Sequence, residues 1–360
     1  FGREETDDER PRPRNAIGQF GVGMKRALFK FGRHFTVQSA TTEEEWGIDV
    51  HVPTWERQKA WTFEWADFDT EHEISRSNPG TEIHVWELNP EVSARFRTKT
   101  FENQIRDLVQ SKHRKFIKQG LEIKINGKAV LPLPLTIFSG GGISPAVHKE
   151  VFEFTKNADV TAWVIAGISD SSPRAAGWYV ICNGRMILEA DTSELTGWRL
   201  QDDDGSVLIP KFHPQFARFR GVVFFESEES RHVPWNTTKT SVDEDSPVWR
   251  KTFDVMVSSM RPVISFLNEL DADIDDYGRD RSPMLAAVTN APSVSADTLQ
   301  REAAFKGPGR GDGEPIEKES RITYKRLESQ VEFLKEVFDL SSNKAVGERT
   351  FDVAYKRQSS

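Results

Sequence analysis

The stretch that decides the fold is a glycine-rich octet near the start of the chain: Gly18-Gln19-Phe20-Gly21-Val22-Gly23-Met24-Lys25. Three glycines within six positions let the backbone approach a bound group closely and take φ values that other residues avoid. Apolar residues follow at helical spacing, so residues 16–32 predict a glycine loop and then a helix capped by Gly32. Backbone N–H groups at such a helix start form a cradle for phosphate oxygens. The octet therefore predicts a phosphate-binding loop.

The spacing of the glycines excludes two common types of phosphate-binding loop. Gly-x-x-Gly-x-Gly is neither the dinucleotide fingerprint nor a Walker A loop, which ends in Gly-Lys-Ser/Thr. The octet resembles the lid-hinge box of the ATPase superfamily that joins gyrase B, heat-shock chaperones, histidine kinases and MutL, and is most similar to the chaperone and MORC versions. This resemblance implies ATP binding by the backbone of Gly18 to Lys25. The alternative is a tight loop that only lets a helix pack on a strand.

The second candidate site residue is a threonine that follows a predicted turn. Asn78-Pro79-Gly80-Thr81 precedes residues 82–88, which alternate as a β-strand does. In the superfamily that the octet resembles, a Gly-Thr pair before the last long strand of the sheet places the threonine hydroxyl near the adenine. The resemblance thus implies an ATP contact for Thr81, and the alternative is a plain turn before a strand.

The third candidate is a lysine in residues 233–240, Val-Pro-Trp-Asn-Thr-Thr-Lys-Thr. The Thr-Lys-Thr core is similar to the gyrase B loop that sends a lysine of the second domain to the γ-phosphate, which implies a catalytic role for Lys239. A compact cation suits charge that develops on a transferring phosphoryl group. Thr237 departs from the pattern, because gyrase carries glutamine there. The alternative is a solvated loop lysine.

The second domain has its own signature. Residues 177–188 form the pattern strand, Asn183-Gly184 turn, strand. The pattern resembles the Asn-Gly-Arg hairpin of MutL-type transducer domains, although hairpins are common in unrelated folds.

Two boxes of the superfamily are not found. One is a helix with a glutamate base and an asparagine Mg²⁺ ligand, and the other is Asp-x-Gly-x-Gly, whose aspartate binds adenine. We expect roughly 80–100 further residues before Phe1, a length set by ordinary domain size, with the Mg²⁺ ligand among them. No metal ligand is assigned within this chain, and we expect it not to hydrolyse ATP well alone, whereas the complete protein would be an ATPase.

These elements predict an α+β fold. Residues 1–120 are expected to form the back half of a Bergerat-type α/β sandwich that binds ATP. Residues 121–270 are expected to form a ribosomal-protein-like β-α-β transducer domain that ends in a helix over 249–270. Acidic residues followed by prolines and glycines predict a flexible linker over 271–318. Helical spacing returns afterwards and predicts a C-terminal helical segment over 319–360.

Composition limits the location and the partners. The 360 residues include 48 basic and 56 acidic ones, and none of the apolar runs is long enough for a membrane span. The single cysteine, Cys182, excludes an internal disulfide and lies in an apolar run, so a buried thiol and a cytoplasmic location are expected. One stretch is basic and could contact DNA, or could be the solvated face of a helix: Arg95, Arg97, Lys99, Arg106, Lys112, Arg114, Lys115 and Lys118.

The resemblance implies an ATP-binding and ATP-hydrolysing conformational switch that needs Mg²⁺ and forms a homodimer when ATP binds. Three functions compete. A DNA-linked clamp fits the lysine loop, the Asn-Gly-Arg hairpin and the basic stretch. A protein-remodelling chaperone fits the residues of the glycine octet. A non-catalytic scaffold would bind ATP without turning it over.

Overall fold

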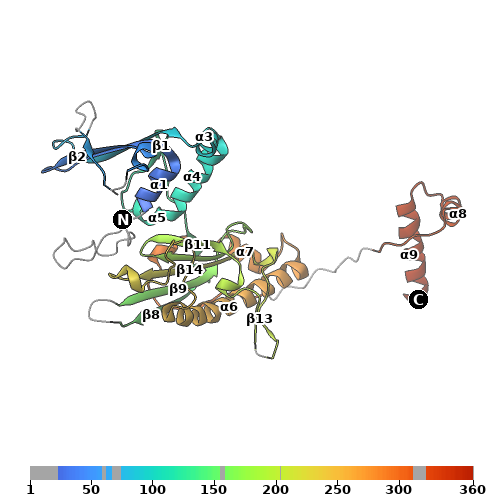
Figure 1. Ribbon diagram of the computed structural model, residues 1–360. Helices are drawn as coiled ribbons and strands as arrows, with labels where there is room; N and C mark the ends of the chain where they lie inside the picture. The colour runs from blue at the N-terminus through green and yellow to red at the C-terminus, as the bar shows by residue number, and fades with distance from the viewer. Residues whose placement is uncertain are drawn as a thin grey trace. The chain divides into compact units, whose positions relative to one another are not determined.

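The computed structural model describes residues 23–58, 62–66, 74–154, 159–202, 204–310 and 322–359. The chain divides into two compact units, with the boundary between Gly313 and Glu314 (Figure 1). Helices and strands are both abundant, which agrees with the α+β prediction. The described part of unit 1 contains two larger sheets that share no strand, together with three two-stranded sheets, and unit 2 is helical.

The first sheet has four antiparallel strands in the order β3-β2-β1-β4. They are β1 (Gly32–Ala40), β2 (Glu45–His51), β3 (Trp65–Ala66) and β4 (Gly80–Leu88). The strand predicted over 82–88 is confirmed as β4. Helix α1 (Gly23–Phe31) covers one face, where Leu28 packs with Phe35 and Val37.

Gly32 does not cap helix α1, so this prediction was wrong. It is the first residue of β1, directly after α1, and its φ is not positive. A Cβ there would lie 2.6 Å from the carbonyl oxygen of Trp86 on β4. The glycine therefore lets two strands approach closely, which a local helix-cap rule does not detect.

Helix α2 (Val52–Trp55) lies between β2 and β3. Three further helices follow the first sheet in the chain: α3 (Pro90–Phe96), α4 (Lys99–Lys112) and α5 (Arg114–Lys118). The basic stretch is divided between these helices, and α4 and α5 are separated at His113, whose ψ of 13° departs from helical geometry. A hairpin follows, β5 (Lys124–Ile125) and β6 (Lys128–Ala129), and its Asn126-Gly127 turn has positive φ at both residues.

The second sheet has five strands in the order β11-β10-β14-β9-β8. They are β8 (Ala146–Phe152), β9 (Val160–Ile168), β10 (Gly177–Cys182), β11 (Arg185–Asp191) and β14 (Phe219–Glu226). Only β10 and β14 pair in parallel within it. The predicted Asn183-Gly184 hairpin joins β10 to β11, again with positive φ at both turn residues.

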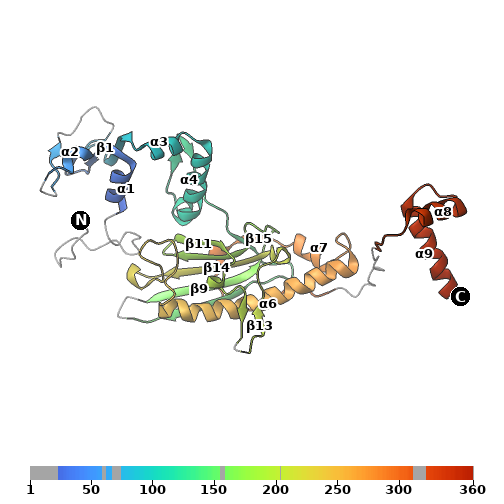
Figure 2. The ribbon, with the colours of Figure 1, turned by 45° about the vertical axis from the view of Figure 1, so that its right-hand side comes forward.

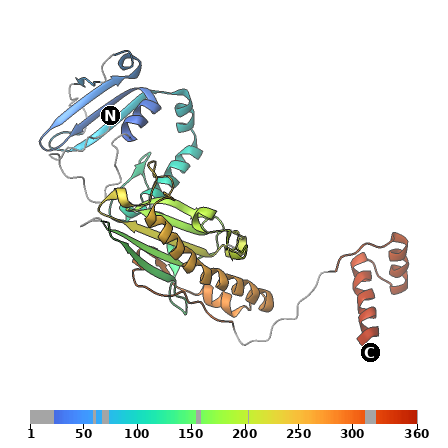
Figure 3. The same ribbon diagram turned by 60° about the horizontal axis from the view of Figure 1, so that its bottom comes forward.

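Both faces of this second sheet are buried. Helix α6 (Pro247–Tyr277) runs along one face, where Met256 and Met260 pack with Trp178 (Figure 3). The opposite face packs against β7 (Thr136–Phe138) and the turn η4 (Ala296–Thr298). Cys182 is buried, and burial raises the pKa of its thiol well above the usual value, so the prediction of a buried thiol is confirmed.

Short elements lie between β11 and α6. They are η1 (Glu194–Thr196), β12 (Leu200–Gln201), β13 (Val207–Ile209), η2 (Pro214–Phe216) and η3 (Ser230–His232). Strands β12 and β13 pair with each other in a small two-stranded sheet.

The predicted linker over 271–318 is wrong for the residues up to 310. Helix α6 continues to Tyr277, and α7 (Pro283–Thr289) and β15 (Ser293–Ser295) follow, with α7 beside the end of α6 in Figure 2. The acidic residues misled the prediction because Asp273 is buried and accepts hydrogen bonds from Ser282 Oγ (2.5 Å) and Met284 N (3.2 Å). Pro283 begins a helix instead of ending one. Residues 311–321 lie outside the described residues.

Unit 2 consists of two helices that contact each other, α8 (Glu328–Phe338) and α9 (Asn343–Ser359). A helix is present within 321–339 as predicted, but its regular part begins only at Glu328. Several large apolar side chains of this unit are exposed, among them Phe333 and Tyr355.

Candidate phosphate-binding site

The structure describes only the end of the glycine octet. Gly18, Gln19, Phe20, Gly21 and Val22 lie outside the described residues. Gly23, Met24 and Lys25 form the first turn of α1. A Cβ added at Gly23 would meet no heavy atom of the described chain within 4 Å, so packing does not demand glycine there.

Thr81 lies at the start of the edge strand β4, opposite Ser39 of β1. The two hydroxyl oxygens are 2.8 Å apart. Because side chains alternate along a strand, Ser39 shares a face with Phe35 and Val37, which is the face that α1 covers. Thr81 therefore lies on the same face of the first sheet as the helix that the octet opens.

Lys239 is held by an ordered turn. Asn236 builds this turn, because its Oδ1 accepts hydrogen bonds from Thr240 N (3.0 Å) and Thr238 Oγ1 (3.1 Å). Lys239 has a φ of 56°, in the left-handed region that costs a residue with a Cβ free energy. Its Nζ lies 5.4 Å from the ring centroid of Trp235. The lysine is thus presented by a defined backbone rather than by a loose loop.

The surroundings disfavour the charged form of Lys239. Burial, and then the charge of Arg185, lower the pKa of its ammonium group. A bound anion would reverse the second effect, because an opposite charge nearby stabilises the charged form. The described contacts place Thr81 and Lys239 in two separate polar clusters.

Arg185 is a cation of this site that the sequence analysis left without a role, although it named the Asn-Gly-Arg hairpin. It is the first residue of β11, directly after the Asn183-Gly184 turn. Its Nε is buried and has no hydrogen-bond partner among the described residues. Burial lowers the pKa of its guanidinium. The only signal in the sequence was its place in the hairpin.

Asn183 fixes the hairpin turn to the segment that leads to Lys239. Its Oδ1 accepts from Ser227 N (2.9 Å), and its Nδ2 donates to Ser227 O (3.1 Å) and Ser230 Oγ (3.3 Å). The side chain is buried, so these bonds are shielded from water. They tie the start of β11 to the chain that follows β14, and so help to keep Arg185 and Lys239 in one region.

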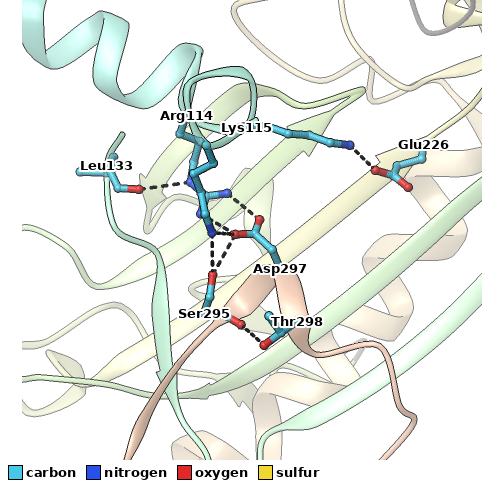
Figure 4. Close-up of polar contacts among 8 residues, drawn as sticks. Arg114, Lys115, Leu133, Glu226, Ser295, Asp297 and Thr298 are labelled. Atoms are coloured by element: carbon cyan, nitrogen blue, oxygen red, sulfur yellow. Dashed lines mark hydrogen bonds and ion pairs between the residues drawn. The ribbon is translucent and has the colours of Figure 1, made fainter. Parts of the chain in front are cut away.

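The basic stretch has mainly internal partners (Figure 4). Arg114 is only 1% exposed and binds both carboxylate oxygens of Asp297, at 2.7 and 2.9 Å. Lys118 Nζ reaches the same carboxylate at 2.7 Å, and Lys115 Nζ lies 2.5 Å from Glu226. Burial alone would raise the pKa of Asp297, but the hydrogen bonds from Arg114 and Lys118 outweigh it and hold the pKa well below its usual value.

Two more cations of the stretch bind carbonyl groups. Arg106 donates to Ala129 O at 3.1 Å, and Lys112 Nζ donates to Ile187 O at 3.1 Å. The alternative of a solvated helix face is therefore wrong for much of α4 and α5. These cations attach the two helices to the β5–β6 hairpin, to the second sheet and to η4, whereas Arg95 and Arg97 are exposed.

A metal site and a membrane-spanning helix are two further features that a chain of this size can contain. Among the described residues, no group of three His, Cys, Asp or Glu side chains is placed to hold a metal ion. The helices in that part of the chain are all too short or too polar to span a bilayer.

Similar chains are found among solved structures, and two of them are bacterial proteins of known type. No protein-family model matches the chain, and no curated protein matches it either. The B-subunit of the DNA gyrase from Myxococcus xanthus is 12% identical, with 76% of each chain covered and a TM-score of 0.34. The topoisomerase IV ATP-binding domain of Francisella tularensis, in complex with a small-molecule inhibitor, is 9% identical, with 71% of this chain and 70% of that chain covered and a TM-score of 0.26. At these TM-scores no residue role is transferred from either structure.

Proposed function

We propose that this chain binds ATP and that Lys239 contacts its γ-phosphate. The observation that carries the proposal is the ordered turn of Asn236 to Thr240, which holds Lys239 in a left-handed conformation beside the charge of Arg185. Two neighbouring cations with lowered pKa values suit a multiply charged anion better than they suit water. The octet that precedes α1, and Thr81 on the α1-covered face, would supply the other ATP contacts.

The proposed mechanism is a conformational switch. Backbone N–H groups of the octet and the start of α1 would bind the phosphates, and Lys239 would join the segment after β14 to the terminal phosphate. Loss of that phosphate removes the anion that Lys239 holds, which releases the segment. Mg²⁺, when bound with ATP, would neutralise part of the triphosphate charge. Homodimerisation on ATP binding is part of the same proposal.

DNA binding through residues 95–118 is not included in the proposed function. Five cations of this stretch already bind carboxylate or carbonyl oxygens of the same chain: Arg106, Lys112, Arg114, Lys115 and Lys118. A phosphate backbone would have to compete with these internal partners.

The test is calorimetric titration of the chain with ATP and with ADP, each with Mg²⁺. The wild type should bind ATP more tightly than ADP, and Lys239→Ala should bind both nucleotides equally. Lys211→Ala is the matched control, because Lys211 is an exposed lysine before η2. A wild-type chain that binds neither nucleotide would overturn the proposal.

Light scattering in the presence of a non-hydrolysable ATP analogue tests dimerisation in the same samples. A turnover assay separates a switch that hydrolyses ATP from a scaffold that only binds it. Binding without turnover would favour the scaffold and leave the nucleotide site in place.

A further inference from the structure

Three basic side chains from two other parts of unit 1 lie around Arg185. Lys112 and His113 come from the junction of α4 and α5, and Lys239 comes from the turn after β14. Helix α4 contacts β11, and Lys112 Nζ donates to Ile187 O of that strand. The charge of Arg185 lowers the pKa of Lys112, of His113 and of Lys239, in each case after the larger effect of burial. Arg185 is therefore close to all three.

The acidic group that faces this cluster is Glu189 of β11. It raises the pKa of Lys112 against the other two effects, and it accepts a hydrogen bond from Ser111 Oγ. Arg185, Lys112 and Lys239 are thus like charges close together in a partly buried place of the described chain. Like charges at short range repel more strongly there than in water. Such an arrangement lowers the stability of the protein until an anion binds.

The two buried arginines among the described residues have protein partners. Arg114 binds Asp297 through two nitrogens. Arg220 donates to the carbonyl oxygens of Ala217, Phe219 and Asp170, at 2.8 to 3.2 Å. Arg185 differs, because its buried Nε has no partner in the described part of the chain. A buried donor without a partner loses its hydration and gains nothing in return, so it calls for an explanation.

We propose that Arg185 binds the terminal phosphoryl group of the same nucleotide that Lys239 contacts, with Lys112 and His113 at the edge of the site. The planar, forked guanidinium suits two phosphoryl oxygens. Arg185 would then supply the second donor that Thr237 does not supply in the lysine loop. The inference rests on the proposed function and adds a residue, from a different strand, that senses whether the γ-phosphate is present.

The first experiment compares Arg185→Gln, Arg185→Lys and the control Arg261→Gln, which removes an exposed arginine on α6. ATP, ADP and inorganic tripolyphosphate are the probes, each titrated calorimetrically. Arg185→Gln should weaken ATP and tripolyphosphate binding at least tenfold and leave ADP affinity within twofold. Arg185→Lys should fall between wild type and Arg185→Gln, because it keeps the charge without the fork. The control should match the wild type.

The outcomes separate the two proposals. If Lys239→Ala weakens ATP binding and Arg185→Gln does not, the role of Arg185 is overturned and the proposed function stands. If the wild type binds tripolyphosphate but not ATP, the assignment to a nucleotide is overturned for both residues.

A second measurement excludes a purely structural role for Arg185. Without ligand, Arg185→Gln should unfold at the same temperature as the wild type or a few degrees higher, since repulsion with Lys112 and Lys239 is relieved. Tripolyphosphate should then raise the unfolding temperature of the wild type only. In NMR titrations, the pKa of His113 should rise in Arg185→Gln and, in the wild type, on adding tripolyphosphate. A ligand-free loss of several degrees in Arg185→Gln would overturn the inference.

Discussion

The two sheets of unit 1 differ in how many of their faces are buried. The first sheet is covered by α1 on one face, while Trp86 on the other face remains 39% exposed. The second sheet is packed on both faces, and Trp178 and Ile181 on its interior strand β10 are almost fully buried. A strand packed on both faces holds its side chains in fixed places. The second sheet can therefore keep Arg185 among like charges, and its residues should affect stability most.

A large loss of stability is expected at the ion pair that joins α5 to the turn η4. Asp297→Ala leaves Arg114, which is 1% exposed, without its carboxylate. Removing one partner of a buried pair costs about 3 kcal/mol. Urea unfolding should show this loss, while Asp280→Ala, at an exposed aspartate after α6, should change the free energy of unfolding by less than about 0.5 kcal/mol. Equal losses would mean that the pair does not stabilise the fold.

The same carboxylate predicts a pH dependence. Because the folded state lowers the pKa of Asp297 below its ordinary value of 3.8, the group stabilises the fold at pH values above 3.8 and loses this contribution as the pH falls below it. The stability difference between wild type and Asp297→Asn should therefore be full at pH 7 and shrink towards pH 3. A constant difference over that range would show that the charge of Asp297 is not responsible.

The second effect is at Gly221 of β14. Its register partner is Trp178, and a Cβ at Gly221 would lie 2.3 Å from the indole ring. Gly221→Ala should therefore destabilise the fold by about 2 kcal/mol, as overpacked cores do. Gly309→Ala, where a Cβ meets no described atom within 4 Å, is the control. Thermal unfolding measures both, and similar midpoints for the two variants would show that the ring moves aside.

How far the sequence predicts the structure depends on the range of the interaction. The hairpin at Asn183 and the strand over 82–88 follow from neighbours in the chain, and they were predicted correctly. Arg114 and Asp297 are 183 positions apart, and no local pattern links them. The same contact explains two errors, since the basic stretch looked solvated and the segment with Asp297 looked flexible. The surroundings of Arg185 are formed jointly by β11, the junction of α4 and α5, and the turn after β14. The hairpin motif alone therefore did not reveal them.

A smaller effect is expected on the exposed face of the first sheet. Trp86 contacts His34 at a ring distance of 4.4 Å but remains partly in water. Trp86→Ala should cost about 1 kcal/mol, because little apolar area returns to water. Trp178→Ala, at a fully buried position of the second sheet, should cost about 4 kcal/mol. Chemical denaturation of both variants tests the contrast between the sheets directly, and comparable losses would mean that the exposed face of the first sheet is covered by further residues.

The smallest effect on stability is expected at Gly23, where an effect on ligand binding is predicted instead. An added Cβ meets no described heavy atom within 4 Å, so Gly23→Ala should leave the unfolding midpoint unchanged or slightly raise it by removing backbone freedom from the unfolded chain. A phosphate bound at the start of α1 would approach the backbone closely, and there the methyl group would crowd it. Nucleotide affinity, measured by calorimetry, should therefore fall in a protein of wild-type stability. If affinity is unchanged as well, the octet only connects α1 to the preceding chain, and the phosphate contacts must come from the cations of the second sheet alone.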